Sequence, residues 1–281
     1  MTQSAHHDDP HHDDFIEEKE MQKYFTEKFK GKHGAQPQQK PPFQKWFQAG
    51  DHHPFTYNHH TIIPGGIFNC ETITDAWFQW FLSTPKQSNP YANPGSASTD
   101  RNSYSDTNAF LFDNRNTLVY FTTASPFQRP DFRRIVITRN APLLVPVYNV
   151  VTSPALYTMK TDDEYVSLVT KDLEGIIPDT VEAKFDGEFI YGCSVIRKKP
   201  LKIYNVPKDN VHAIPENRLI DSNFSIDVYH GGFWLLIKEE KITPGDHLLY
   251  FKAQSINYEI EANILISALV GVPEKAREQH H

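Results

Sequence analysis

The sequence is poor in cysteine, and this limits the sites that it can build. Two cysteines occur in 281 residues, Cys70 and Cys193, and neither belongs to a CxxC or CxxH spacing. A thiolate zinc site and a framework of several disulfides are therefore excluded. A single disulfide between the two cysteines stays open.

Long apolar runs and an excess of positive charge are also absent. No stretch approaches the roughly eighteen apolar residues that a membrane-spanning helix needs. The first residues are rich in His and Asp and lack the apolar core of a secretory signal. The formal net charge is −7, whereas a general nucleic-acid binder needs a basic surface. We therefore expect a cytoplasmic protein with no nucleic-acid partner and no membrane span; a processed export signal stays open.

The common signatures of catalysis are missing as well. The sequence contains no G-x-S-x-G nucleophile motif. It also lacks H-E-x-x-H and a glycine-rich phosphate loop. No reaction can be predicted from motifs, so any site must be assembled by the fold.

Strand patterns are abundant in the last third of the chain. The apolar run at 232–237 is typical of a strand buried on both faces. Pro244-Gly245 indicates a type II turn, after which 247–253 returns as a second strand. From Ile256 to Ile266 every second residue is apolar, which indicates a strand with one wet face. These segments predict an antiparallel meander around which the rest of the chain packs.

Further elements are predicted by local patterns. Strands are expected at 118–123, 134–138, 143–151, 181–185, 189–191, 195–196 and 201–206. Asp186-Gly187 favours a type I′ hairpin turn. Thr161 and Glu164 have capping-box spacing for a helix that ends at Gly175.

A second helix is expected at about 74–82, with Thr74 as its cap and Pro85 beyond its end. Its aromatic residues lie nearly all round the helix, which predicts that two sheets enclose it and that it closes one end of a sandwich. Trp80 is therefore expected to be a large buried side chain.

Together these patterns predict a mainly β protein, an antiparallel and jelly-roll-like β-sandwich at 46–270 with two or three short helices. Residues 1–45 form an N-terminal arm, which consists of a His/Asp-rich start, a helix at about 14–29 and a linker. Residues 86–117 form a long polar loop, and 271–281 form a tail.

Three segments together resemble a family of uncharacterised bacterial proteins, often exported, with a β-sandwich core. They are W-F-Q-W-F-L-S-T-P at 77–85 with Asn89-Pro90, L-L-V-P-V-Y-N at 143–149, and G-F-W-L-L-I-K at 232–238 with P-G-D-H at 244–247. The resemblance covers about residues 70–266 and implies the fold but no reaction.

One departure from that family concerns its cysteine pair. Its members tend to carry one cysteine after the Asn-Pro loop, but 86–117 contains none here. The second cysteine position falls near Ile135. The disulfide that the resemblance implies is missing, which favours a reducing compartment.

The arm contains the candidate metal ligands. His6, His7, His11 and His12 lie beside aspartates, and imidazole with carboxylate suits a divalent transition metal such as Zn, Ni or Cu. Adjacent histidines point apart on a helix or a strand, so these pairs chelate well only in flexible backbone.

A candidate ligand site within the domain combines Asn149, His230 and Trp234. His230 precedes Gly231-Gly232, where bare backbone could admit a ligand, and Asn149 is a polar residue inside an apolar strand. His247 follows a turn, where its imidazole could instead satisfy a loop carbonyl.

Two functions follow from these patterns. The leading hypothesis is a non-enzymatic binding or assembly protein, which forms a homo-oligomer or binds a protein partner through its arm and long polar loop. The rival is a metal-dependent enzyme in a jelly-roll-like barrel. In it His212, His230 and His247 converge with Asp227 or Asp246.

Overall fold

The structure, a computed structural model, describes residues 61–63, 66–68, 70–92, 109–114, 117–123, 131–177, 180–190, 192–219, 224–256 and 258–271. The chain divides into two units, Met1–Gln39 and Lys40–His281, and all of these residues belong to the second. The predicted arm helix and the candidate metal ligands His6, His7, His11 and His12 lie outside the described residues.

The described part of the chain is mainly β. Its strands are β1 (Thr61–Ile63), β2 (Gly66–Phe68), β3 (Ala109–Asn114), β4 (Thr117–Thr122), β5 (Asp131–Ile137), β6 (Leu143–Thr152), β7 (Glu182–Phe185), β8 (Glu188–Phe189), β9 (Cys193–Ile196), β10 (Leu201–Ile203), β11 (Ile226–Ile237), β12 (Gly245–Gln254) and β13 (Glu259–Ala268). The helices are α3 (Cys70–Ser83) and α4 (Asp162–Glu174), with short 3-10 turns η2 (Lys86–Ser88), η4 (Glu216–Arg218) and η5 (Glu239–Lys241).

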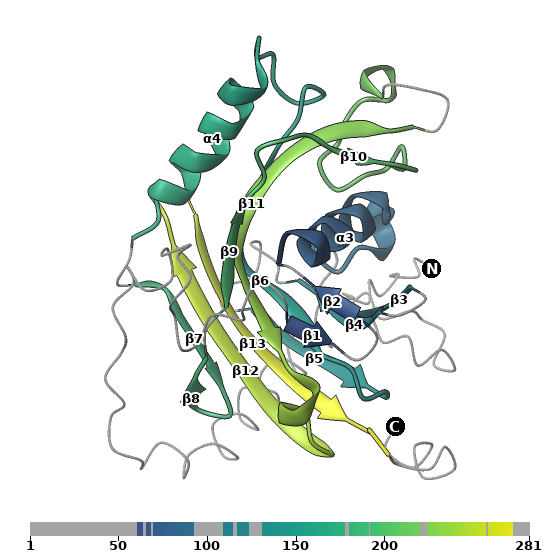
Figure 1. The fold of residues 1–281 in the computed structure, drawn as a ribbon, viewed down its shortest axis with the longest axis vertical. Helices are drawn as coiled ribbons and strands as arrows, with labels where there is room; N and C mark the ends of the chain where they lie inside the picture. The colour runs from purple at the N-terminus through teal and green to yellow at the C-terminus, as the bar shows by residue number, and fades with distance from the viewer. Residues whose placement is uncertain are drawn as a thin grey trace, which may run out of the picture. The chain divides into compact units, whose positions relative to one another are not determined.

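Strands β1 and β2 pair only with each other, and the other strands form two large sheets (Figure 1). The β11 sheet has the order β10-β11-β6-β4-β3, with β9 also paired to β11, and the β12 sheet has the order β5-β13-β12-β7-β8. Most neighbours are antiparallel, but β4 and β6 are parallel, and so are β5 and β13. The sheets are therefore mixed, and the prediction of an antiparallel fold is wrong at these two pairs. No hairpin links the strands of either pair directly, so local turns do not set their direction.

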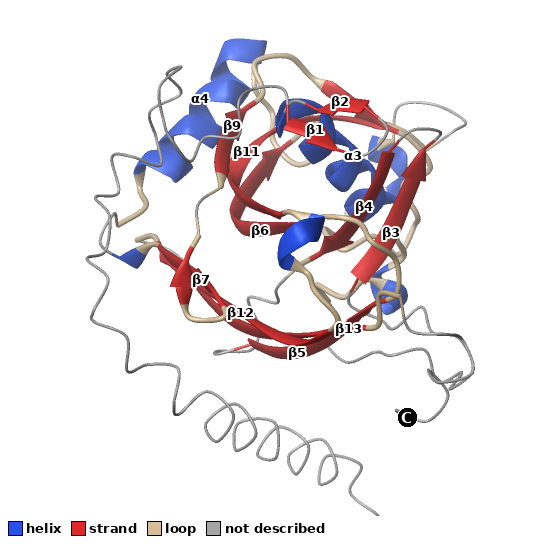
Figure 2. Cartoon of the chain, turned by 60° about the horizontal axis from the view of Figure 1, so that its bottom comes forward, coloured by secondary structure: helices blue, strands red, loops and turns tan. Residues whose placement is uncertain are grey.

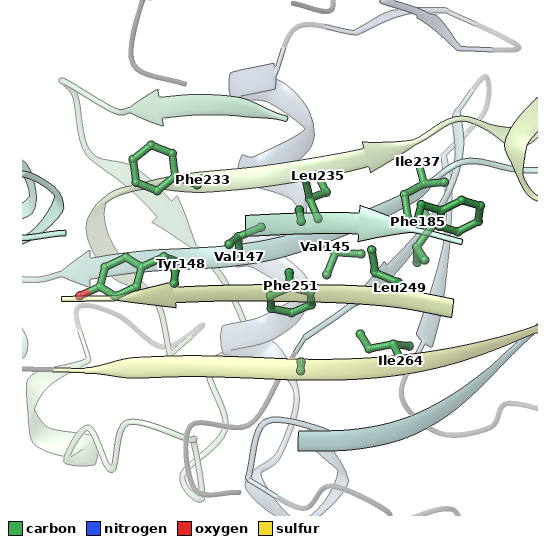
Figure 3. Packing of buried hydrophobic residues seen from close by; sticks show 14 of the residues in the cluster. Val145, Val147, Tyr148, Phe185, Phe233, Leu235, Ile237, Leu249, Phe251 and Ile264 are labelled. Atoms are coloured by element: carbon green, nitrogen blue, oxygen red, sulfur yellow. The ribbon is translucent and has the colours of Figure 1, made fainter. Parts of the chain in front are cut away.

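The two sheets face each other across a continuous hydrophobic core (Figure 3). Val145 and Leu235 come from the β11 sheet, and Leu249, Phe251 and Ile264 come from the β12 sheet. All five side chains are buried.

The inward face predicted for the last strand is confirmed at Ala262, Ile264 and Ile266. It is wrong at Ile256 and Tyr258, which are exposed because β13 begins only at Glu259.

Helix α4 packs on this same face of the β11 sheet, where Val169 and Leu173 join the core. The Thr161 side chain accepts a hydrogen bond from the Glu164 backbone, and the Glu164 carboxylate accepts one from Thr161 N. This capping box and the end at Gly175 confirm the predicted helix.

Helix α3 covers the opposite face of the β11 sheet, within the curve of its strands (Figure 2). Trp77, Phe78 and Phe81 are buried against Trp234 and its neighbours, which confirms that these aromatics are core residues. The predicted location is wrong, however, because the helix covers one sheet instead of closing an end between two.

The predicted start of this helix is wrong as well. The helix begins at Cys70, and the Thr74 hydroxyl donates to Glu71 O inside the helix instead of capping it.

Two other local predictions have opposite outcomes. Asp186 and Gly187 both have positive φ, 51° and 85°, as the predicted type I′ turn requires. By contrast, β3 pairs along its whole length with β4 although it lies inside the predicted polar loop at 86–117. The polar composition of that segment concealed a short apolar run at 109–112.

We predict that Trp77→Ala destabilises the protein more than Trp80→Ala does. Trp77 is fully buried and its indole donates to Thr122 O at 2.9 Å, so truncation costs about 3–5 kcal/mol. Trp80 is half-buried, so the prediction of a fully buried side chain is wrong, and its truncation leaves a smaller cavity. Denaturant unfolding of both variants measures the difference, and equal losses would contradict this ranking.

Candidate functional site

A cluster of ionisable side chains lies between α3 and the β11 sheet. It consists of Glu71, Asp75, Arg197 and His230, and we call it the α3 cluster. Glu71 and Asp75 lie four residues apart on α3, so they share one face of the helix. Arg197 follows β9, and its backbone N–H donates to the carbonyl of His230 at 2.8 Å. Strand pairing thus brings the two basic residues together beneath the helix.

Hydrogen bonds link the α3 cluster from the surface into the core. Arg197 Nη1 donates to Glu71 Oε1 at 3.0 Å and forms a second ion pair with Asp75 Oδ2. The other Asp75 oxygen lies 2.8 Å from His230 Nε2. Glu71 is exposed, Arg197 and Asp75 are partly buried, and the His230 side chain has no exposed surface.

The bond to Asp75 indicates the tautomer of His230. A carboxylate can only accept, so Nε2 carries the hydrogen and Nδ1 presents a lone pair. This Nδ1 is buried and has no hydrogen-bond partner. Burial lowers the pKa of His230; Asp75 opposes this effect, and the charge of Arg197 adds to it. The imidazole is therefore neutral at pH 7.

Aromatic rings enclose the inner end of the α3 cluster. The Phe78 ring lies 4.2 Å from the His230 ring and 5.7 Å from that of Trp234, measured between centroids. The Trp234 indole N–H is also buried without a partner. Among the described residues Asp75 alone hydrogen-bonds to the His230 imidazole, so no hydroxyl or thiol is placed as a nucleophile for it.

Other segments of the chain pack closely against the two glycines after His230. This corrects the prediction that these glycines expose bare backbone to a ligand. A Cβ at Gly231 would meet Val169 Cγ1 at 2.8 Å, and one at Gly232 would meet Tyr148 O at 2.5 Å. The space at Gly231 is filled by side chains of α4, and the space at Gly232 is filled by β6. The residues are glycine because two elements approach β11 closely here.

The three predicted ligand residues lie close together on the β11 sheet. His230 and Trp234 both contact Phe78, and half-buried Asn149 pairs with Gly232 between them. Sequence reasoning missed the acidic residues and Arg197. The four-residue spacing of Glu71 and Asp75 was a visible signal, but nothing in the sequence related it to Arg197.

The other two histidines of the proposed metal site lie elsewhere. His247 Nε2 contacts Thr243 O at 2.7 Å, as the structural interpretation predicted, and its Nδ1 contacts Asp186 Oδ2 at 2.7 Å. His212 lies beside Phe81, with its ring centroid 6.0 Å away.

No group of three or more His, Cys, Asp or Glu within the described ranges could hold a metal ion. The predicted convergence of His212, His230 and His247 is therefore wrong. Each imidazole serves the packing of a different loop or strand.

Cys70, the first residue of α3, is disulfide-bonded. The sequence has one other cysteine, Cys193, and β9 begins there. The disulfide and the Glu71–Arg197 pair therefore both hold the first turn of α3.

No protein-family model, curated protein or solved structure matches this chain. Neither α-helix in the described ranges has the length and apolar character needed to cross a bilayer.

We predict that protein denatured without reductant contains no reactive thiol, and that reduction releases two. The reason is that Cys70 is already bonded and the chain has two cysteines in total. A thiol-reactive dye under denaturing conditions counts them. Two reactive thiols before reduction would contradict the prediction.

We also predict that the protein loses stability as pH falls below about 6.5. The pKa of His230 is lowered from its ordinary value of 6.5 by burial, so the unfolded chain binds the proton more readily. Stability is complete above pH 6.5 and falls, by at most about 1.4 kcal/mol per pH unit for one histidine, towards the folded pKa.

Denaturant unfolding from about pH 5 to about pH 7.5, on wild type and on His230→Gln, tests this window, because the variant lacks the titrating group. Burial also lowers the pKa of His212, so the His230→Gln variant keeps part of the pH dependence of stability. His212→Gln, which removes this second titrating group, serves as the control. An identical slope in wild type and His230→Gln would refute the assignment.

Proposed function

We propose that this is a non-enzymatic binding and assembly protein that self-associates through its N-terminal arm, residues 1–45, and the polar parts of the segment 86–117 outside β3. One contrast supports this proposal. The imidazole of His230, at the inner end of the α3 cluster, is enclosed, whereas large apolar side chains are exposed on the surface of the described domain. Chemistry that substrate cannot reach suits anchoring, and exposed apolar groups suit association.

Finer assignments belong to the same proposal. A jelly-roll-like sandwich and membership of the resembling bacterial family are supported by two facing β sheets. For the compartment, a disulfide at Cys70 favours export over the cytoplasm, because disulfides persist in oxidising environments. We keep His6, His7, His11 and His12 as a candidate site for a divalent transition metal in the arm.

Light scattering of the full chain and of a variant lacking residues 1–45 tests the proposal. We expect the full chain to show at least twice the monomer mass and the deletion variant to show the monomer mass, because the arm supplies the contact. An unchanged thermal transition would show that the remaining domain, to which all described residues belong, is intact. Equal masses for the two proteins would refute assembly through the arm.

A further inference from the structure

The hairpin between β12 and β13 presents apolar side chains at its tip. Ser255 N donates to Tyr258 O at 2.6 Å, which closes the turn, and Tyr258 N donates to Ser255 Oγ at 3.0 Å. Ile256 is 84% exposed and Tyr258 is 55% exposed. Turns of this kind favour Gly, Asn, Asp and Ser, which need no burial. An isoleucine at such a tip loses hydrophobic stabilisation unless something covers it.

A third exposed apolar residue is hydrogen-bonded next to the same turn. Ile177 N donates to Gln254 O at 2.8 Å, and its side chain is exposed. The chain after α4 therefore runs beside the end of β12. Ile177, Ile256 and Tyr258 together form what we call the hairpin patch.

Carboxylates lie on the strands next to the hairpin turn, on the solvent face of the β12 sheet. Lys252 lies opposite Glu182 and Glu261 in the register of the neighbouring strands. Its Nζ forms ion pairs with Glu259 Oε1 at 2.9 Å and with Glu261 Oε2 at 3.7 Å. Lys184 forms an ion pair with Glu182. Three carboxylates thus share two lysines on this face.

A fourth carboxylate, that of Asp172, interacts with a tyrosine that is hydrogen-bonded to the hairpin turn. Tyr148 donates to Ser255 Oγ at 3.1 Å, and the pKa of Tyr148 is raised by burial and further by the charge of Asp172. Burial also raises the pKa of Tyr250, and the charges of Glu261, Glu182 and Glu259 add to that effect. The surroundings of the hairpin patch are therefore net acidic, which suits a basic partner with apolar side chains.

Residues 21–32 of this chain have that chemistry. The segment reads M-Q-K-Y-F-T-E-K-F-K-G-K, with four lysines against one glutamate and with the aromatic residues Tyr24, Phe25 and Phe29. Its predicted helix is too short to be stable without a partner surface. We propose that residues 21–32 of a second copy dock on the hairpin patch. The assignment rests on the proposed self-association and names its surface.

If each copy docks its segment on the other copy, the assembly is a closed dimer. Each copy carries one segment and one hairpin patch, so two copies related by a two-fold axis satisfy both pairs. The lysines then lie against the carboxylates that flank Lys252, and the aromatic rings cover Ile256 and Tyr258. Salt weakens such an assembly because it screens the exposed charges.

Three full-length variants test the contact by light scattering. The patch variant is Ile256→Ser with Tyr258→Ser, and the segment variant is Tyr24→Ser with Phe25→Ser and Phe29→Ser. The control is Leu156→Ser with Tyr157→Ser, a pair with similar character, 37% and 47% exposed, in a different loop. We expect the first two to fall to the monomer mass and the control to keep the wild-type mass, with unchanged thermal transitions in all three.

Mixing distinguishes a second copy from other occupants. The patch variant keeps an intact segment and the segment variant keeps an intact patch, so an equimolar mixture regains one of the two contacts and forms a weaker dimer. No dimer in the mixture would overturn docking between copies and would favour the same chain or another basic protein as the occupant.

The remaining outcomes separate this proposal from the one that it rests on. A full chain that is monomeric at every concentration would refute both. A dimeric patch variant beside a monomeric segment variant would refute only the hairpin patch and would leave assembly through the arm in place.

Discussion

The structure depends on the fact that β11 is apolar on both faces. Of its twelve residues all but Asp227 are buried, and the strand contributes to two separate cores. A strand that is apolar on both faces needs another element packed against each face. The β12 sheet and α4 cover one face, and α3 covers the other. Neither helix is therefore an appendage, because removing either one would expose apolar residues of the longest described strand.

The charged groups beneath α3 are explained by this need for a cover. Ion pairs at a buried interface contribute little net stability, but they fix one arrangement among several apolar ones. The polar contacts follow the helix in sequence, from the pairs at Glu71 and Asp75 to the Trp77 indole. The Gln79 side chain then donates to Tyr204 O and accepts from Tyr204 N. An aromatic helix that could slide along an apolar sheet is held at one register.

The features that sequence predicted are those with local causes. The Asp186-Gly187 turn and the capping box of Thr161 are determined by a few adjacent residues, and both are confirmed. The α3 cluster and the two parallel strand pairs join segments far apart in the chain, so no local pattern indicates them. The start of α3 was missed because a disulfide and an ion pair with the distant Arg197 hold its first turn, and no local pattern indicates them.

The parallel pairing of β5 with β13 determines when the protein can finish folding. Asp131 is matched with Ala262, and the alignment continues to Ile137 with Ala268. Contacts between such distant positions close a long loop and form slowly. During synthesis the β12 sheet stays incomplete until residue 268 has left the ribosome, while the apolar face that it will cover already exists. The nascent chain is therefore most prone to aggregation, and most dependent on chaperones, in the interval before its final strand is released.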